Sequence, residues 1–362
     1  MRLSWVELRD FRNHPETRLE DIPEGLVVAV GPNGEGKTNL LEGIAFLFLL
    51  QSPRTSSTEP VVRRGAEAAY ARGEAETGGG RMLVEVEIPG RGANRVKLNR
   101  SAVRRKRDVR KQVRGVFFGP DDLVVVIGDP SRRREFMDEA IRTLWPLKEG
   151  VITAYDRVLR QRNRLLKEWE GRGAPTGLEA WDAELVEAGS ALVRLRREAV
   201  ERLALPAARD YEHLAGYALA CDYTPNTGDE PLEEVFVERL GARRQDEVVR
   251  RTTLVGPHRD ELSLAVRDLR ARSFASHGEA WAAAVCLRLG LAAAVTEEIG
   301  ERPMVLLDDP FSALDPRRQA RVAEGLSDRG QVFVSVADEA HVPEGAHRIW
   351  DVTAGSVTER NR

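Results

Sequence analysis

Eight consecutive residues decide the fold that this sequence predicts: Gly31-Pro32-Asn33-Gly34-Glu35-Gly36-Lys37-Thr38. They match the pattern G-x-x-x-x-G-K-[ST]. They lie between an apolar run at Leu26 to Val30, expected to be a buried strand, and helical spacing from Lys37 to Leu50. In this context the backbone N–H groups of the loop and the helix start form a phosphate-binding site. We expect Lys37 to bridge the β- and γ-phosphates of ATP and Thr38 to ligate Mg²⁺; the alternative is a glycine-rich turn without function.

A second apolar run ends in two carboxylates and completes this predicted site. Residues Met304 to Leu307 are expected to form a buried strand, and Asp308 and Asp309 follow at the end where open α/β sheets bind ligands. We expect Asp308 to hold Mg²⁺, directly or through water, and Asp309 to orient or deprotonate the attacking water. Arg54, after the first predicted helix, is a candidate arginine finger for the γ-phosphate.

The region between the two motifs predicts an insertion. Thr38 and Asp308 lie 270 residues apart, too far for a compact nucleotide-binding domain. Short alternating stretches between glycine-rich turns, from Ala68 to Leu98, predict an antiparallel sheet. After Gly128 the composition is strongly helical for more than a hundred residues, with a heptad-like seam from Leu178 to Ala199.

The expected fold class is therefore α/β. It comprises an ATPase head, built of a mixed sheet with helices and an antiparallel β subdomain, and an inserted α-helical arm. The expected domains are 1–128, the N-terminal half of the head with the β subdomain; 129–250, the arm; and 251–362, the C-terminal half of the head.

Composition limits the cellular setting and the partners. With 55 basic and 58 acidic residues the net charge is −3, so binding to a polyanion requires local patches. The two cysteines, Cys221 and Cys286, lack disulfide or metal-ligand spacing, which indicates a reducing compartment and core positions. The N-terminus is charged, and the longest apolar run, Ile44 to Leu50, is too short to span a bilayer. We expect a cytoplasmic protein without a membrane partner.

Several further motifs, in this order, resemble those of the RecF family, which are DNA replication and repair ATPases of the ABC/SMC type. Besides the phosphate loop they are Leu8-Arg9-Asp10-Phe11-Arg12-Asn13, Phe118-Gly119-Pro120-Asp121-Asp122-Leu123, Gln161-Arg162-Asn163-Arg164-Leu165-Leu166, Leu254-Val255-Gly256-Pro257-His258-Arg259-Asp260, Ser276-His277-Gly278 and Leu307-Asp308-Asp309-Pro310-Phe311-Ser312-Ala313-Leu314-Asp315. The resemblance extends along essentially the whole chain.

The resemblance implies a function. It implies an SMC-like head that dimerises around two ATP molecules, with Mg²⁺ as the metal, and a weak DNA-stimulated ATPase whose slow turnover allows release. It implies binding to gapped or junction DNA, cooperation with RecR to load the RecA recombinase, and roles in replication restart and the SOS response. It also implies a nucleoid-associated location.

The resemblance also assigns residues. Arg12 and Asn13 are expected to contact the nucleotide, Ser276 and Gly278 to reach the γ-phosphate of the opposite subunit, and Asp315 to couple the two sites. The expected catalytic residues are Lys37, Asp309 and Ser276. The expected nucleotide-binding residues are Arg12, Asn13, Gly31, Pro32, Asn33, Gly34, Glu35, Gly36, Lys37, Thr38, Asn39, Ser276, Gly278 and Asp315.

Three departures from the family pattern concern turnover. Glu279 stands where a glutamine is usual, and His277 stands where a smaller or amide residue is usual. A carboxylate near a partner's nucleotide is unfavourable unless it is paired or solvated. No switch histidine is evident after the predicted strand Val332 to Val336. We therefore expect slow hydrolysis.

Two basic segments are candidates for DNA contact. The block from Arg91 to Arg114 holds eleven Lys or Arg residues and one acid, Asp108, and its alternative interpretation is a solvated, partly mobile loop. The predicted arm carries a second basic face, which could also serve solubility alone. Such residues contact phosphates without reading sequence. The candidates are Arg104, Arg105, Lys106, Arg107, Arg110, Lys111, Arg157, Arg160, Arg164 and Lys167.

Two other functions share some of these features. The ATP-hydrolysing subunit of a membrane transporter would have the same nucleotide motifs, but it needs neither the long insertion nor the basic block. A structural DNA-binding protein would use nucleotide only as a stabilising ligand. Replacement of Lys37 distinguishes an ATP-driven dimer that clamps DNA from the structural DNA-binding protein, because DNA clamping would survive the replacement only in the structural protein.

Overall fold

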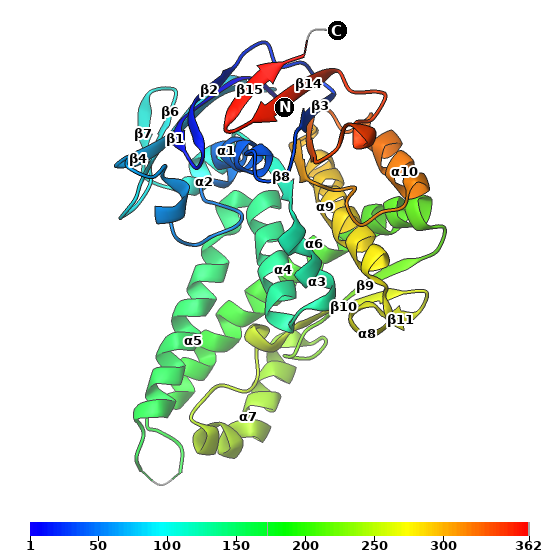
Figure 1. Ribbon diagram of the computed structural model, residues 1–362. Coiled ribbons are helices and arrows are strands. Elements are labelled where there is room, and N and C mark those ends of the chain that lie inside the picture. The colour runs from blue at the N-terminus through cyan, green and yellow to red at the C-terminus, as the bar shows by residue number, and fades with distance from the viewer. Residues whose placement is uncertain (172, 361–362) are drawn as a thin grey trace.

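The computed structural model describes residues 1–171 and 173–360, and its centre is a mixed sheet (Figure 1). Within these residues six strands lie in the order β15-β14-β3-β13-β12-β8, parallel except for β15. The strands are β3 (Leu26–Val30), β8 (Gly115–Phe118), β12 (Met304–Asp308), β13 (Val332–Val336), β14 (Arg348–Thr353) and β15 (Ser356–Glu359). Because β3 pairs with β13 and β14, the sheet closes only with the C-terminal part of the chain.

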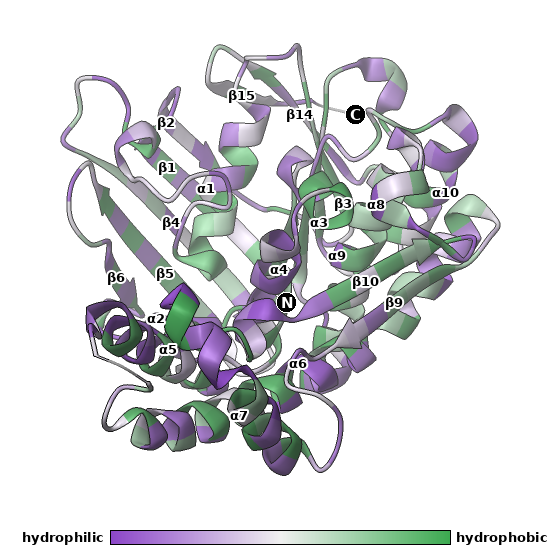
Figure 2. Ribbon diagram, turned by 90° about the horizontal axis from the view of Figure 1, so that it is seen from below, coloured by the Kyte–Doolittle hydropathy of each residue, from purple (hydrophilic) through white to green (hydrophobic). Residues whose placement is uncertain are grey.

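A second, antiparallel sheet covers the first helix, α1 (Lys37–Leu49). Its order is β2-β1-β4-β5-β6-β7, and its strands alternate hydrophobic and hydrophilic residues (Figure 2). The strands are β1 (Arg2–Phe11), β2 (His14–Leu19), β4 (Ala68–Thr77), β5 (Gly80–Pro89), β6 (Arg95–Leu98) and β7 (Ser101–Val103). Helix α1 packs so closely on this sheet that a Cβ on Gly43 would lie 2.5 Å from Leu8. One apolar core joins both sheets to α1.

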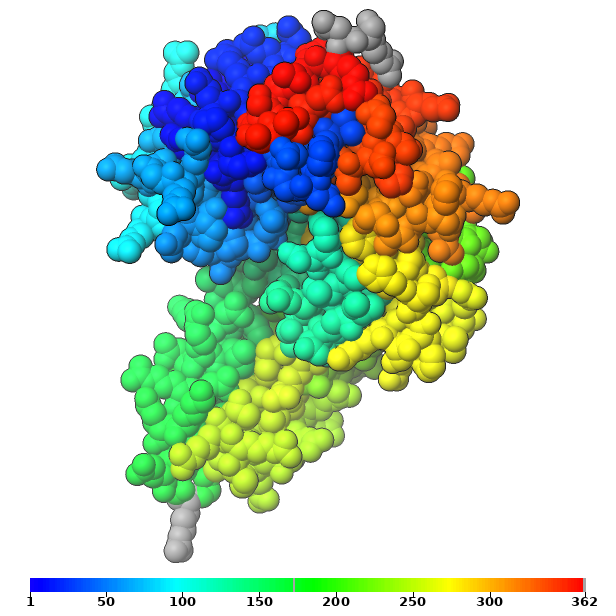
Figure 3. Space-filling model, in the orientation of Figure 1, coloured from blue at the N-terminus to red at the C-terminus, as the bar shows by residue number. Residues whose placement is uncertain are grey.

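Helices cover the other face of the central sheet and extend into an arm (Figures 1 and 3). The seam predicted from Leu178 to Ala199 lies on a 38-residue helix that continues to Ala215. This helix packs against α9, the apolar helix that begins after Ser276. The helices are α2 (Lys106–Arg110), α3 (Leu123–Ile127), α4 (Pro130–Leu144), α5 (Gly150–Glu168), α6 (Leu178–Ala215), α7 (Leu232–Arg250), α8 (Ala271–Phe274), α9 (His277–Ile299) and α10 (Pro316–Leu326).

Helix α9 is long and apolar enough to cross a membrane by composition, but 89% of its most apolar window is buried inside the protein. It is therefore a core helix. Cys286 on this helix is buried, as predicted, whereas Cys221 is only partly buried. Single turns of 3-10 helix occur at η1 (Glu59–Val61), η2 (Pro120–Asp122), η3 (Pro146–Lys148), η4 (Pro257–Arg259) and η5 (Glu339–His341).

The segment expected to be uniformly helical contains a strand, and this corrects the sequence interpretation. Strand β9 (Leu219–Thr224) pairs with β10 (Glu261–Val266), which continues into β11 (Leu269–Arg270). Leu219, Cys221 and Tyr223 alternate with Ala220, Asp222 and Thr224, a period-two pattern that the sequence interpretation overlooked after a long helical stretch. The domain boundaries at 128 and 250 stay a prediction.

A fully buried arginine holds the arm helices together. Arg162 on α5 donates to Asp182 on α6 (2.8 Å), to Glu247 on α7 (2.6 Å) and to the hydroxyl of Thr253 (2.8 Å). Both Arg162 and Glu247 have 0% side-chain exposure. Because a buried charge without its partner is strongly unfavourable, this network keeps α5, α6 and α7 in one arrangement.

We expect Arg162→Ala to lower the free energy of unfolding by about 3–5 kcal/mol, because it leaves the fully buried carboxylate of Glu247 without its cation. Urea denaturation followed by circular dichroism measures this change. Arg164→Ala is the matched control on the same helix, since Arg164 is 70% exposed and pairs only with the exposed Glu168. Equal midpoints for the two variants would contradict the role assigned to Arg162.

Candidate nucleotide-binding site

The phosphate loop joins β3 to α1, and glycine determines its shape. Gly36, directly before α1, has φ of 116°, and a Cβ there would lie 2.6 Å from the side-chain amide of Asn13. The ammonium group of Lys37 donates to the carbonyl oxygens of Gly31 (2.6 Å) and Pro32 (2.8 Å). The loop therefore places a lysine and the start of a 13-residue helix at one point, where both favour an anion.

Thr38 and Asp308 meet at the ends of α1 and β12. The Thr38 hydroxyl donates to Oδ1 of Asp308 (2.9 Å), and the Ser335 hydroxyl donates to the same oxygen (2.6 Å). Burial raises the pKa of Asp308, and these two hydrogen bonds oppose that shift. The described residues contain no group of three or more His, Cys, Asp or Glu that could hold a metal by themselves. Two hard oxygen ligands fit Mg²⁺, which commonly completes its shell with phosphate oxygens and water.

Asp309 follows β12 with φ of 50°, a left-handed conformation. Its N–H donates to the Ser335 hydroxyl (3.0 Å), so one serine positions both carboxylates. Burial raises the pKa of Asp309, while the charges of Lys37 and His341 lower it. A carboxyl group balanced in this way is suited to orient or deprotonate a water molecule.

Arg12, Asn39 and Arg54 gather around a carboxylate that sequence reasoning missed. Glu42 on α1 is fully buried and accepts two hydrogen bonds from Arg12, at 2.7 and 2.9 Å. Arg54 donates to Glu42 (3.2 Å) and to Asn39 (3.0 Å). The side chain of Asn39 also donates to Asn13 (2.8 Å). Glu42 therefore holds the predicted nucleotide ligand Arg12 and the candidate arginine finger Arg54.

Two other residues near the site were also missed. His341 in η5 lies five residues beyond β13, and its charge acts on Asp309, although no switch histidine was evident in the sequence. The buried His14 ring is 3.0 Å from the carbonyl oxygen of Gly36 and supports the phosphate loop. Neither residue stands in a motif, so spacing along the chain could not show it.

Ser276 and Glu279 form a reciprocal cap at the start of α9. The Ser276 hydroxyl accepts from the N–H of Glu279 (3.3 Å), and the Glu279 carboxylate accepts from the N–H of Ser276 (2.8 Å). Tyr217 donates to the same carboxylate (2.6 Å), and Arg267 forms an ion pair with it. Burial favours the neutral form, but the hydrogen bonds from Tyr217, Ser276 and Arg267 lower the pKa of Glu279 to about 2. The unusual carboxylate is thus paired.

The start of α9 adjoins the loop that contains Asp315. A Cβ on Gly278 would lie 3.1 Å from the carbonyl oxygen of Ala313, and Trp281 donates to the carbonyl oxygen of Pro310 (2.8 Å). Asp315 caps α10 by accepting from two backbone N–H groups. This surface is well separated from α1 in the molecule (Figure 1). The predicted signature residues therefore do not join the phosphate loop of their own chain.

The family of this chain follows from similarity along its whole length. A family model described as the RecF/RecN/SMC N terminal domain matches residues 2–359. The chain is 41% identical to the DNA replication and repair protein RecF of Streptomyces avermitilis, over 95% of each chain. It is also 41% identical to the protein of the same name from Frankia alni, over 99% of each chain. This chain belongs to the RecF family.

Solved structures agree with the RecF assignment. The structure of the recombination mediator protein RecF-ATP in the RecFOR pathway has a TM-score of 0.88 at 27% identity, covering 99% of this chain and 97% of that chain. The Smc head domain with an extended coiled coil, derived from Pyrococcus furiosus, has a TM-score of 0.57 at 15% identity and shows a shared fold, covering 99% of this chain and 95% of that chain. The predicted resemblance to RecF and the predicted fold class are confirmed.

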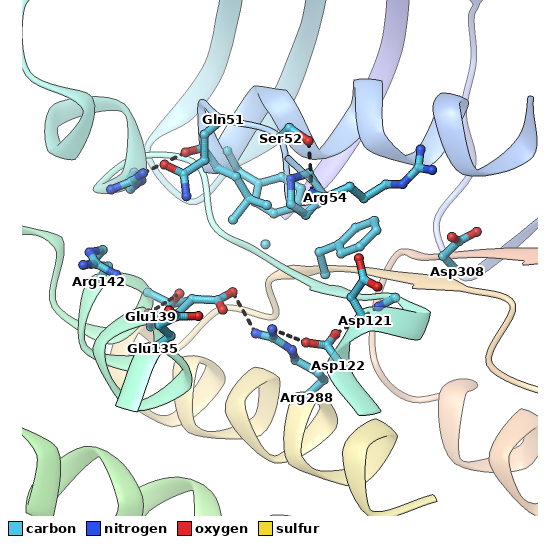
Figure 4. A pocket seen from close by; sticks show the side chains of 18 of the residues that line it. Gln51, Ser52, Arg54, Asp121, Asp122, Glu135, Glu139, Arg142, Arg288 and Asp308 are labelled. Atoms are coloured by element: carbon cyan, nitrogen blue, oxygen red, sulfur yellow. Dashed lines mark hydrogen bonds and ion pairs between the residues drawn. The ribbon is translucent and has the colours of Figure 1, made fainter. Parts of the chain in front are cut away.

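A cavity of about 490 Å³, which we call the Asp308 cavity, is lined by Thr38 and Asp308 and by residues of β8, α4 and α9. Figure 4 shows it with Asp308 on one side and Arg142 on the other. Arg288 of α9 lines it and donates to Asp122 (2.6 Å) and to Glu139 of α4 (2.7 Å). These two carboxylates raise the pKa of the buried Arg288, against the effect of burial. The cavity thus connects the predicted metal ligands Thr38 and Asp308 with the helices that lead to the arm.

A second cavity, of about 900 Å³, contains residues from both basic segments. We call it the basic groove; it lies between α2 and the start of α5, and its single carboxylate is Glu149. Its cations are Arg105, Lys106, Arg107, Arg110, Arg142 and Arg157. The block from Arg91 to Arg114 is not the loop of the alternative interpretation, because much of it folds into β6, β7 and α2.

The other predicted DNA contacts lie outside the basic groove. Arg104 and Lys111 are exposed beside it, and Arg160, Arg164 and Lys167 are exposed farther along α5. Arg110 differs from them because its guanidinium is only 13% exposed and is hydrogen-bonded within the protein. All of these DNA contacts stay predictions.

We expect Ser335→Ala to raise the Mg²⁺ concentration needed for half-maximal binding of ATP about tenfold, because loss of a group that orients metal ligands typically has this effect. Titration of Mg²⁺ against a fluorescent ATP analogue measures it. Ser356→Ala, at an exposed position on β15, is the control. An unchanged Mg²⁺ midpoint in Ser335→Ala would remove Ser335 from the site.

We expect Glu279→Gln to lower stability at pH 7, although it restores the usual family residue. The folded pKa of Glu279, about 2, lies below the unfolded value of about 4.3, so its ionised form stabilises the fold above that range. This contribution disappears as the pH falls from about 4.3 to 2. Urea midpoints of both proteins between pH 7 and pH 3 should therefore converge at low pH. A constant difference would show that the carboxylate charge is not the cause.

Proposed function

We propose that this chain is an ATP-dependent mediator of DNA repair whose two copies dimerise around two ATP molecules on DNA. Slow, DNA-stimulated hydrolysis then releases the DNA. By family membership the chain helps RecR to load the RecA recombinase at gaps and junctions between single- and double-stranded DNA, in replication restart and the SOS response. The same membership supports a cytoplasmic, nucleoid-associated location. The full-length match to RecF proteins favours this function over a transporter subunit.

One observation carries this proposal. The phosphate loop and the carboxylates lie together at the ends of β3 and β12, while Ser276 and Asp315 stand at the starts of α9 and α10, which are drawn away from α1 (Figure 1). Ser276 stands at the start of a 23-residue helix, where a hydroxyl group and free N–H groups favour an anion. A second copy of the chain is the partner that can bring this surface to the nucleotide. Each ATP would then be held from both sides.

The chemistry follows from the residues at the phosphate end. Lys37 and the loop N–H groups would neutralise charge that develops on the phosphoryl oxygens, and Mg²⁺ held by Thr38 and Asp308 would add to it. Asp309 would position the attacking water. Arg54 would approach the γ-phosphate only after leaving Glu42 and Asn39. That cost supports slow hydrolysis.

Contact with DNA would depend on the backbone phosphates. The basic groove and the exposed cations of α5 offer Lys and Arg side chains that pair with phosphates, so we expect binding by DNA structure and a strong dependence on salt.

We expect ATP with Mg²⁺ to double the molar mass of the natural protein in solution, and not that of Ser276→Arg, whose side chain would block the contact with the partner's phosphate. Light scattering coupled to size-exclusion chromatography measures both masses. A mass that does not respond to ATP in the natural protein would rule out the nucleotide as the link between subunits.

Lys37→Ala separates this switch from a structural DNA-binding function. The variant loses a charge that would contact the phosphates, so we expect it to lose both the ATP-dependent dimer and ATP-dependent retention on circular DNA. Retention that persists in Lys37→Ala would favour a structural protein for which nucleotide is only a stabilising ligand.

A further inference from the structure

Arg110 lies at the boundary between the Asp308 cavity and the basic groove. It lines both cavities, together with Gln51 and Arg142. The Asp308 cavity also reaches Thr38 and Asp308. In Figure 4, Asp308 lies on the opposite side of this cavity from Arg142. The Asp308 cavity and the basic groove are therefore adjoining spaces with Arg110 between them.

The hydrogen bonds of Arg110 connect three elements. One guanidinium nitrogen donates to the carbonyl oxygen of Leu49 (2.8 Å), the last residue of α1. The other donates to the carboxylate of Glu149 (3.0 Å), directly before α5. A cation at a helix C-terminus is favourable, so the contact with Leu49 also stabilises α1. Arg110 itself ends α2 and thus joins the phosphate-loop helix, the basic block and the arm.

The basic groove has excess positive charge on two separate elements. Six cations line it against one carboxylate, and among the described residues only Arg110 of these six forms an ion pair. Partial burial and the nearby Arg110 charge lower the pKa of Lys106. Such a groove favours a polyanion that contacts both walls. A nucleic-acid backbone would contact Arg105, Lys106 and Arg107 on one side and Arg157 on the other.

We propose that Arg110 is a positioning residue that transmits the binding of a DNA backbone in the basic groove to the phosphate loop. This inference rests on the proposed DNA-stimulated ATPase. A backbone that contacts both walls changes the position of α2 relative to α5, and Arg110 is bonded to both sides. Its bond to Leu49 passes the displacement to α1. Because α1 is a continuous buried helix, movement at Leu49 reaches Lys37 and Thr38 at its other end.

The experiment measures ATP turnover of the full-length chain with and without saturating gapped duplex DNA, and the affinity for that DNA by fluorescence anisotropy. In Arg110→Gln we expect the stimulation ratio to fall to about one. In Glu149→Gln we expect opposite effects: DNA binds more tightly, since the single carboxylate of the groove is gone, while the stimulation ratio still falls. A residue with only an electrostatic role in DNA binding would not separate these two quantities.

Arg157→Gln is the matched control, because Arg157 lines the basic groove without a hydrogen bond to α1. It should weaken DNA binding and reduce the slope of log affinity against log salt by about one. At saturating DNA its stimulation ratio should equal that of the natural protein. A reduced ratio in Arg157→Gln would overturn the inference.

The remaining outcomes distinguish the two proposals. If DNA stimulates the natural protein and Glu149→Gln equally, the transmission through Arg110 is wrong and the proposed function stands. If DNA binds to the natural protein without changing turnover, the DNA-stimulated ATPase fails, and the inference fails with it. Glu149→Gln keeps the test decisive should Arg110→Gln not fold.

Discussion

The pairing of β3 with β13 and β14 is the constraint on which the rest of the structure depends. It joins residues near the two ends of the chain into one sheet, and this brings Thr38 within hydrogen-bonding distance of Asp308. The backbone of parallel strands satisfies its hydrogen bonds only when both partners are present. The candidate nucleotide site therefore forms only when β3 has paired with strands from the C-terminal part of the chain.

That inserted segment is firmly attached to the head. Arg196 of α6 donates to the buried Asp260 before β10 (3.1 Å), and Arg288 of α9 donates to Glu139 of α4 (2.7 Å). A buried ion pair of this kind stabilises the fold little more than well-packed apolar residues would. Removing one partner, however, strongly destabilises the fold because the other charge stays buried without compensation. These ion pairs favour a single position of the arm relative to the head. A displacement of the arm is therefore expected to move the head with it.

The sequence allowed prediction of what is local, namely the phosphate loop, the carboxylate strand, the antiparallel sheet and the seam of α6. Each depends on a period or motif within about forty residues. Glu42 and Ser335 were missed because their roles depend on partners brought near by the fold. Strand β9 was missed because its six residues follow closely on a long helical pattern, although Leu219, Cys221 and Tyr223 alternate along it.

The paired state of Glu279 bears on how the signature surface can bind phosphate. Its charge is compensated by Arg267 and by hydrogen bonds from Tyr217 and from the N–H of Ser276. The Glu279 carboxylate thus repels an approaching phosphate less than an unpaired carboxylate would. It also accepts the hydrogen bond of the Ser276 N–H, which is then not free to bind phosphate. Fewer donors then remain for the partner's nucleotide, which weakens stabilisation of charge in the transition state. The slow turnover proposed for this chain would therefore follow from hydrogen bonds already made within the subunit.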